Sequence, residues 1–114
     1  MAKNGKNLTY LRAANQGALI KTILLSGPST RLELAAALNL PAMSISYITS
    51  DFLEKGILSE IADDPPSNVP GRHSAQLALV PRKITAIGIS ISRNSVYCTL
   101  TDLLGEIMYS NELR

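Results

Sequence analysis

Residues 30–56 have the sequence TRLELAAALNLPAMSISYITSDFLEKG, and the fold of the chain is decided here. Thr30 is followed three residues later by Glu33, a spacing at which the two residues cap the start of a helix. Asn39, which tolerates the left-handed backbone conformation, is suited to end that helix, and Pro41 suits the first turn of another. The stretch therefore predicts two short helices joined by a tight turn.

The second of these helices is expected to have an apolar face and an opposite, exposed face. Intervals of three and four residues place one set on a single buried stripe: Ile45, Ile48, Thr49, Phe52 and Leu53. Another set projects from the opposite side: Met43, Tyr47, Ser50 and Glu54. Two such helices at an angle are typical of the helix-turn-helix, whose second helix enters the major groove of DNA. An ordinary helical hairpin in a protein core would show the same pattern.

The segments on either side extend this pattern. Residues 1–7 are polar and are expected to form a disordered leader, and residues 8–26 predict a helix that Gly27 and Pro28 end. Its apolar face is expected to contain Leu11, Leu19, Ile20, Ile23 and Leu24. Residues 57–61 and 75–80 predict two strands, and the loop between them is rich in turn residues. Three helices followed by a two-stranded hairpin, the wing, predict a winged helix-turn-helix domain over residues 8–81.

The wing loop contains three residues that suit contact with DNA, namely Gly71, Arg72 and His73. Glycine lets the backbone approach a ligand closely, and an arginine at a hairpin tip can enter a narrow minor groove. The alternative is a solvated surface arginine. His73 has no nucleophile or carboxylate spaced to work with it, so we expect a residue at the edge of the site and not a catalytic base.

Residues 82–114 have a different pattern, in which residues 84–92, 95–101 and 106–110 predict three antiparallel strands. This short meander gives the whole chain an α+β fold class. It would expose two edges and one apolar face, so it needs a covering layer from the winged domain, from a second chain or from residues outside this sequence. Of these, we expect a homodimer.

Composition excludes several classes of protein. The chain has 114 residues and a net charge of +2, and residues 1–31 contain five basic residues and no acidic one, which suits contact with phosphate. One cysteine and one histidine leave no internal disulfide and no zinc site, so we expect no metal. Without a long apolar run or the apolar core of a signal peptide, a cytoplasmic protein with no membrane partner is expected.

Over residues 8–110 the chain resembles the N-terminal part of transcriptional repressors of the ROK family. The motifs that carry the resemblance are, in chain order, Leu11, Arg12 and Asn15; Gly27, Pro28, Ser29, Thr30, Arg31, Glu33, Leu34 and Ala35; Ser44, Ile45, Ser46 and Ile48; Leu53, Gly56, Ile57 and Leu58; Gly71 and Arg72; Ala86, Ile87, Gly88 and Ile89; and Asp102, Leu103 and Gly105. The resemblance implies a winged helix that binds operator DNA as a dimer. It also implies that residues 82–114 are the opening strands of an actin-like sugar-kinase domain.

Two departures from the family pattern limit what the resemblance implies. Ser90 and Ser92 stand where kinases of the family have an Asp-x-Gly pair that holds phosphate, so we expect no enzyme activity, no cofactor, and no binding of sugar or ATP. Pro41 and Tyr47 stand where the family commonly has serine and arginine, so the operator sequence does not carry over.

The function expected from these patterns is a sequence-specific DNA-binding transcriptional regulator, a repressor of carbohydrate-related genes that binds double-stranded DNA. The residues expected to contact DNA are Arg31, Ala42, Met43, Ser44, Ser46, Tyr47, Gly71, Arg72 and His73. The alternative is a winged helix used for protein contact without DNA binding, which Met43 and Tyr47 and the acidic pair Asp63 and Asp64 would suit.

Overall fold

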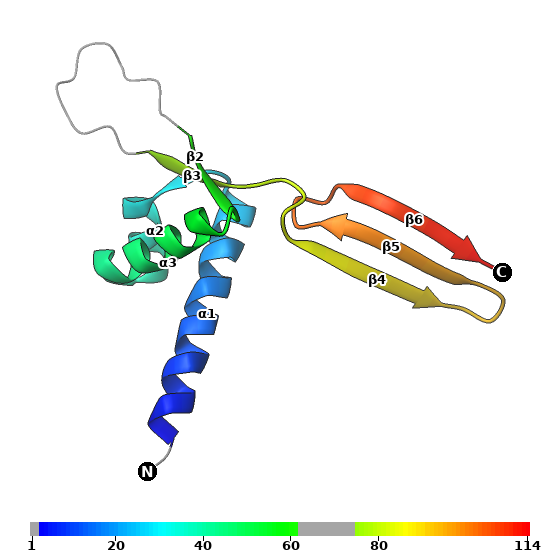
Figure 1. Ribbon diagram of the computed structural model, residues 1–114, viewed down its shortest axis with the longest axis horizontal. Coiled ribbons are helices and arrows are strands. Elements are labelled where there is room, and N and C mark those ends of the chain that lie inside the picture. The colour runs from blue at the N-terminus through cyan, green and yellow to red at the C-terminus, as the bar shows by residue number, and fades with distance from the viewer. Residues whose placement is uncertain (1–2, 62–74) are drawn as a thin grey trace. The chain divides into compact units, whose positions relative to one another are not determined.

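The computed structural model describes residues 3–61 and 75–114, which divide into two compact units (Figure 1). We call Met1–Leu79 the helical unit and Val80–Arg114 the sheet unit. Within the described residues, the helical unit has three α-helices and a three-stranded sheet, and the sheet unit has a second three-stranded sheet. The α+β class expected from the sequence is confirmed.

The first helix, α1 (Lys3–Ser26), is longer than expected. It begins at Lys3, so residues 3–7, which were expected to be a disordered leader, continue the helix. It ends as predicted at Gly27, which has a left-handed φ of 83° and donates its N–H to the Ile23 carbonyl at 2.8 Å. Only the C-terminal half packs on the rest of the unit, and Figure 1 shows the other half extending past the remaining elements. The expected apolar face is therefore partly wrong, because Leu11 and Leu24 are 54% and 39% exposed.

The next two helices, α2 (Arg31–Leu38) and α3 (Ala42–Glu54), have the predicted local signals at their ends. Thr30 Oγ1 accepts the Glu33 N–H at 3.1 Å, and Asn39 adopts the left-handed conformation with φ of 52°. After α3, Gly56 has φ of 74° and the Ile57 N–H bonds the Phe52 carbonyl at 2.9 Å, a Schellman arrangement that ends the helix. Short-range capping thus sets the turn between α2 and α3.

The core of the helical unit is built where the three helices and the sheet meet. Its buried apolar side chains are Leu19, Ile23, Leu34, Ile45, Ile48, Phe52, Leu58, Leu77 and Leu79. The predicted α3 stripe is confirmed at Ile45, Ile48, Thr49 and Phe52, whereas Leu53 is half-buried. Thr49 is fully buried and donates its hydroxyl to the Ile45 carbonyl at 2.7 Å, which satisfies the polar group inside the core.

The sheet of the helical unit has one strand more than the expected two-stranded wing. Its strands are β1 (Ser29–Thr30), β2 (Leu58–Ile61) and β3 (Gln76–Leu79), in the antiparallel order β1-β3-β2. The two predicted strands are present and pair with each other. The sequence did not indicate the third strand, because β1 has only two residues, too few to show alternation, and it is defined by pairing with distant β3. Through β1, the residue that caps α2 is attached to the sheet.

The sheet unit contains β4 (Thr85–Ile91), β5 (Val96–Asp102) and β6 (Ile107–Leu113), in the order β4-β5-β6. This is the predicted meander, although β6 runs to Leu113 and not to residue 110. The register places apolar partners across one face, namely Ile87 with Leu100, Ile89 with Cys98 and Ile91 with Val96. The three isoleucines are 64–77% exposed, so this apolar face has no cover among the residues of the sheet unit.

Two leucines on α2 offer a matched test of this packing. Leu34 is 0% exposed in the core and Leu32 is 79% exposed on the same helix. Leu34→Ala should lower the free energy of unfolding by about 2 to 5 kcal/mol because it opens a cavity. Leu32→Ala should change it by less than about 0.5 kcal/mol. Urea denaturation followed by circular dichroism measures both, and equal losses would mean that α2 packs by another face.

Candidate nucleic-acid interface

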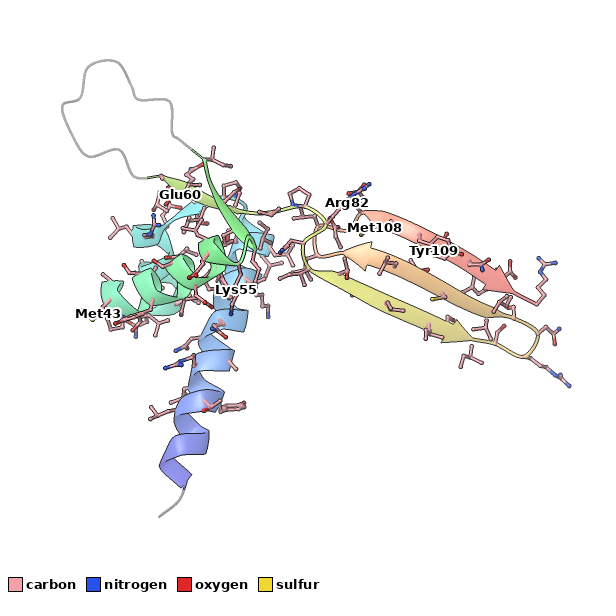
Figure 2. The ribbon with its side chains drawn as sticks, viewed as in Figure 1. Met43, Lys55, Glu60, Arg82, Met108 and Tyr109 are labelled. Carbon is pink, nitrogen blue, oxygen red and sulfur yellow. The ribbon has the colours of Figure 1, made fainter. Side chains whose placement is uncertain are left out.

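The exposed face of α3 is set by the rotation of the helix in the core. With Ile45, Ile48 and Phe52 buried, the opposite side faces outward. Met43 and Tyr47 are 71% and 75% exposed, and Ser50 and Glu54 continue the same row toward the C-terminal end. Figure 2 shows Met43 at one end of α3 and Lys55 at the other.

The structure brings some of the predicted DNA-contacting residues together and separates others. Ala42, Met43, Ser46 and Tyr47 are all exposed within the first two turns of α3. Ser44 is half-buried on the same helix, and Arg31 is half-buried at the start of α2. Gly71, Arg72 and His73 lie outside the described residues. A group of four side chains on α3 is therefore the part of the predicted site that the structure describes as one surface.

The chemistry of this surface suits the edges of bases. Ser46 offers a hydroxyl that donates or accepts, Tyr47 adds a phenolic hydroxyl, and Met43 offers an apolar side chain for a thymine methyl group. At the start of α3, Pro41 is the N-cap residue and makes no side-chain capping hydrogen bond. No side chain at that position therefore competes with an anion for the first N–H groups of the helix, where the helix dipole is positive.

Charge divides α3 along its length. The first turn contains no acidic residue, whereas Asp51 and Glu54 lie near the C-terminal end. Lys55 Nζ bonds Asp51 Oδ2 at 2.9 Å, while Glu54 forms no ion pair with any residue the structure describes. A polyanion is therefore repelled at the C-terminal end and tolerated at the N-terminal end. The sequence places Glu54 on this face but does not show how its charge limits the approach of the helix to a duplex.

Arg31 is held by a partner that the sequence did not indicate. Its Nη2 bonds Glu60 Oε1 on β2 at 2.8 Å, and the two side chains are 37% and 48% exposed. The two residues are 29 positions apart, so only the folded sheet brings them together. Arg31, predicted to contact DNA, thus already has its charge compensated in this structure.

The described residues hold little that would suit another kind of site. Within them, no three histidine, cysteine, aspartate or glutamate side chains gather where a metal ion could bind. None of the helices found there combines the length and apolar character needed to cross a bilayer.

With this α+β fold and this exposed helix surface, the chain resembles the N-terminal part of a ROK-family transcriptional regulator. The sequence motifs indicated the same resemblance. A solved structure of a ROK-family transcriptional regulator, a homologue of the Escherichia coli MLC protein, matches 90% of this chain with a TM-score of 0.70 and 21% identity. At that identity the match establishes the fold. No protein-family model matches the chain.

Two curated relatives are similar over most of the chain. The DNA-binding transcriptional dual regulator NagC of Escherichia coli K12 is 26% identical over 102 residues, 90% of this chain. The xylose repressor of Bacillus spizizenii is 27% identical over 100 residues, 88% of this chain. The chain spans about a quarter of the length of these relatives, 25% and 26% respectively.

The Arg31–Glu60 pair gives a test of the interface. Glu60→Gln removes an exposed ion pair, so the free energy of unfolding should change by less than about 1 kcal/mol. Arg31 then becomes available to phosphate, and binding to random duplex DNA should tighten and its dependence on log salt concentration should steepen by about one unit.

A matched control separates this effect from a change in net charge. Glu112→Gln removes the same charge from the Glu112–Arg114 pair of the sheet unit and should leave the salt dependence unchanged. Fluorescence anisotropy over a salt series measures both variants. Equal tightening in the two would place Arg31 outside the interface.

Proposed function

We propose that this chain is a sequence-specific DNA-binding module of a transcriptional regulator. The observation that carries the proposal is the orientation of α3, whose core contacts expose Met43 and Tyr47 on the outer face. In a helix-turn-helix, the N-terminal residues of the second helix contact base edges in the major groove. Ala42, Met43, Ser46 and Tyr47 are in that position on α3, and Ser44 lies beside them.

The sheet supports a winged form of this motif. Strands β2 and β3 follow α3 directly and pair as an antiparallel hairpin, the position that a wing occupies. The loop between them contains Gly71, Arg72 and His73, which we propose as minor-groove or phosphate contacts from the sequence alone.

The relatives suggest what such a module would regulate. One is named a DNA-binding dual regulator and another a xylose repressor. We propose by similarity that this chain acts in repression of carbohydrate-related genes and is not itself an enzyme. Ser90 in β4 and Ser92 just beyond it, in place of the phosphate-holding pair of related kinases, are consistent with that role.

A second candidate function is a winged helix that contacts protein and not DNA. The exposed apolar side chains of the helical unit favour it, since Leu32, Met43 and Tyr47 are all more than two-thirds exposed. Methionine and tyrosine are enriched in protein interfaces. A salt titration of binding to random duplex DNA separates the two candidates, because counterion release weakens DNA binding steeply as salt rises.

We also propose that the chain pairs with a second copy through the apolar face of the sheet unit. That face contains Ile87, Ile89 and Ile91 of β4 beside Val96, Cys98 and Leu100 of β5, with no charged side chain among them. The charge that β5 adds to this face is Asp102 at its end, opposite Thr85, and Asp102 already accepts hydrogen bonds from the Arg82 and Glu106 N–H groups. Two identical faces of this kind can stack without leaving a buried charge unpaired, and β4 and β6 leave open edges. A two-fold dimer would also present two copies of α3 to a palindromic site.

The base-contact role of α3 predicts a specific defect. Tyr47→Ala should weaken binding at the preferred site by about 1 to 3 kcal/mol and blur the preference at one or two base pairs. Tyr10→Ala is the matched control, because Tyr10 is 73% exposed on α1 and Tyr47 is 75% exposed on α3. Selection of bound sites from a random DNA pool, with circular dichroism to confirm folding, measures both. Identical site preferences in parent and Tyr47→Ala would favour the protein-contact candidate.

Pairing through the sheet unit predicts a change in mass. The parent should sediment with twice the monomer mass at micromolar concentration, and Ile89→Thr, at the centre of the apolar face, should shift it toward monomer. Ser90→Thr makes a matched change on the opposite face of the same strand and should remain dimeric. A monomeric parent would mean that the apolar face is not a dimer interface.

A further inference from the structure

Arg82, near the start of the sheet unit, has an unusual backbone conformation. Its φ is 63°, in the left-handed region, where a residue with a Cβ atom is disfavoured and glycine or asparagine is usual. Such a conformation persists when surrounding interactions impose it. Here the imposing groups come from the turn between β5 and β6.

Two carboxylates hold Arg82 from that turn. The backbone N–H of Arg82 donates to Asp102 Oδ2 at 3.1 Å. Its guanidinium donates through Nε and Nη2 to the two carboxylate oxygens of Glu106, a bidentate pair. Asp102 Oδ1 in turn accepts the Glu106 N–H at 2.8 Å, so one carboxylate binds both partners. We call Arg82, Asp102 and Glu106 the Arg82 latch, and Figure 2 shows Arg82 beside the start of β6.

Asp102 is the buried member of the latch at 5% exposed, whereas the Arg82 and Glu106 side chains are 60% and 45% exposed. The Asp102 backbone N–H also bonds the Glu106 carbonyl at 3.1 Å. Next to it, the Leu103 N–H bonds the Ile84 carbonyl at 3.2 Å, which attaches the segment before β4 to the same turn. Arg82 and the residues that follow it are thus anchored to the sheet unit through side chains and backbone together.

Little chain remains between this anchor and the helical unit. Strand β3 ends at Leu79, so Val80 and Pro81 alone separate its last residue from Arg82. Pro81 has a fixed φ, and the Lys83 N–H bonds the Val80 carbonyl at 3.5 Å across the turn. Few backbone torsions can therefore change where one unit joins the other.

We propose that the Arg82 latch is a conformational device that makes residues 82–84 a rigid part of the sheet unit and confines movement between the units to Val80 and Pro81. Asp102 acts in it as a positioning residue. An ordinary turn-stabilising cluster would support β5 and β6 without affecting how the units move. The inference does not depend on DNA binding, so it stands or falls separately from the proposed function.

Backbone ¹⁵N relaxation of the full chain tests the proposal. In the parent, the heteronuclear NOE of Arg82 and Lys83 should equal that of β4 and β5, and the two units should tumble with similar correlation times. Asp102→Asn replaces one acceptor oxygen with a donor, so amide exchange at Arg82 and Glu106 should accelerate at least tenfold. The NOE at residues 82–84 should fall, and the correlation times of the units should diverge.

Two further variants keep the test decisive. Glu106→Gln breaks the bidentate pair with Arg82 while leaving both Asp102 acceptor oxygens in place. If Asp102→Asn fails to fold, the NOE and correlation times of Glu106→Gln test the latch instead. Glu112→Gln removes an equal charge from the same unit outside the latch and should leave residues 82–84 ordered. Loop-like NOE values at Arg82 in the parent would overturn the proposal, as would unchanged correlation times in both latch variants.

Acid should open the latch, and the hydrogen bonds to its two carboxylates determine the direction of this pH dependence. The Glu106 N–H lowers the pKa of Asp102 below its ordinary 3.8, and the Arg82 N–H lowers it further against the opposing effect of burial. Hydrogen bonding from Arg82 likewise lowers the pKa of Glu106. The charged groups that face Asp102 are Arg82 and Glu106. Because the pKa values of Asp102 and Glu106 are lower in the folded protein, the latch contributes to stability above their unfolded pKa values. That contribution is lost as pH falls through the folded pKa values. The NOE at Arg82 should therefore stay high at pH 5 and fall only below about pH 3.8.

Discussion

The packing of the α3 stripe against the other elements of the core is the constraint on which the helical unit depends. Ile45 and Thr49 are fully buried one turn apart, beside Leu19 of α1, Leu34 of α2 and Leu77 of β3, which are also fully buried. A helix whose single buried stripe belongs to a core shared with α1, α2 and β3 cannot rotate without exposing that stripe and burying another. The outward direction of Met43 and Tyr47 is thus a consequence of core packing, which fixes the helix that carries the surface proposed to bind DNA.

The small sheet stabilises that arrangement from the other side. Strand β3 lies between β1 and β2 and supplies Leu77 and Leu79 to the core. Strand β3 pairs with β1, which contains Thr30, the residue whose hydroxyl caps α2. Strand β3 also pairs with β2, which begins directly after the Schellman turn that ends α3. The two ends of the α2–α3 pair are therefore fixed to the two outer strands of one sheet, on either side of β3. A two-residue strand is enough for this, because it bonds at the point where the helix begins.

Local signals made much of this predictable from the sequence. The Thr30 cap, the left-handed Asn39, the Gly27 and Gly56 stops and the α3 stripe all act within a few residues, so their patterns are visible in the chain itself. Features that depend on distant partners were not visible. Strand β1 exists by pairing with β3, Arg31 is compensated by Glu60, and Arg82 is held by Asp102 and Glu106. For the candidate site, the sequence therefore indicated which α3 residues are exposed. It did not indicate which basic side chains are already paired with carboxylates, as Arg31 is with Glu60.

That distinction changes how the charge of the chain bears on DNA binding. Phosphate contacts dominate affinity for a duplex, yet Arg31 and Lys55 of the helical unit are already paired with carboxylates. Arg12 and Lys21 form no ion pair with the residues described, but they are nine positions apart on α1. At about 100° per residue they point to opposite sides of that helix, so one line of phosphates cannot meet both. Between Arg12 and Lys55, no two basic side chains that lack an ion pair with the described residues therefore share one face of a helix. Specific binding would then rest on the fit of α3 and on presenting two copies of it together, since pairing doubles the phosphate contacts without requiring more cations on one surface.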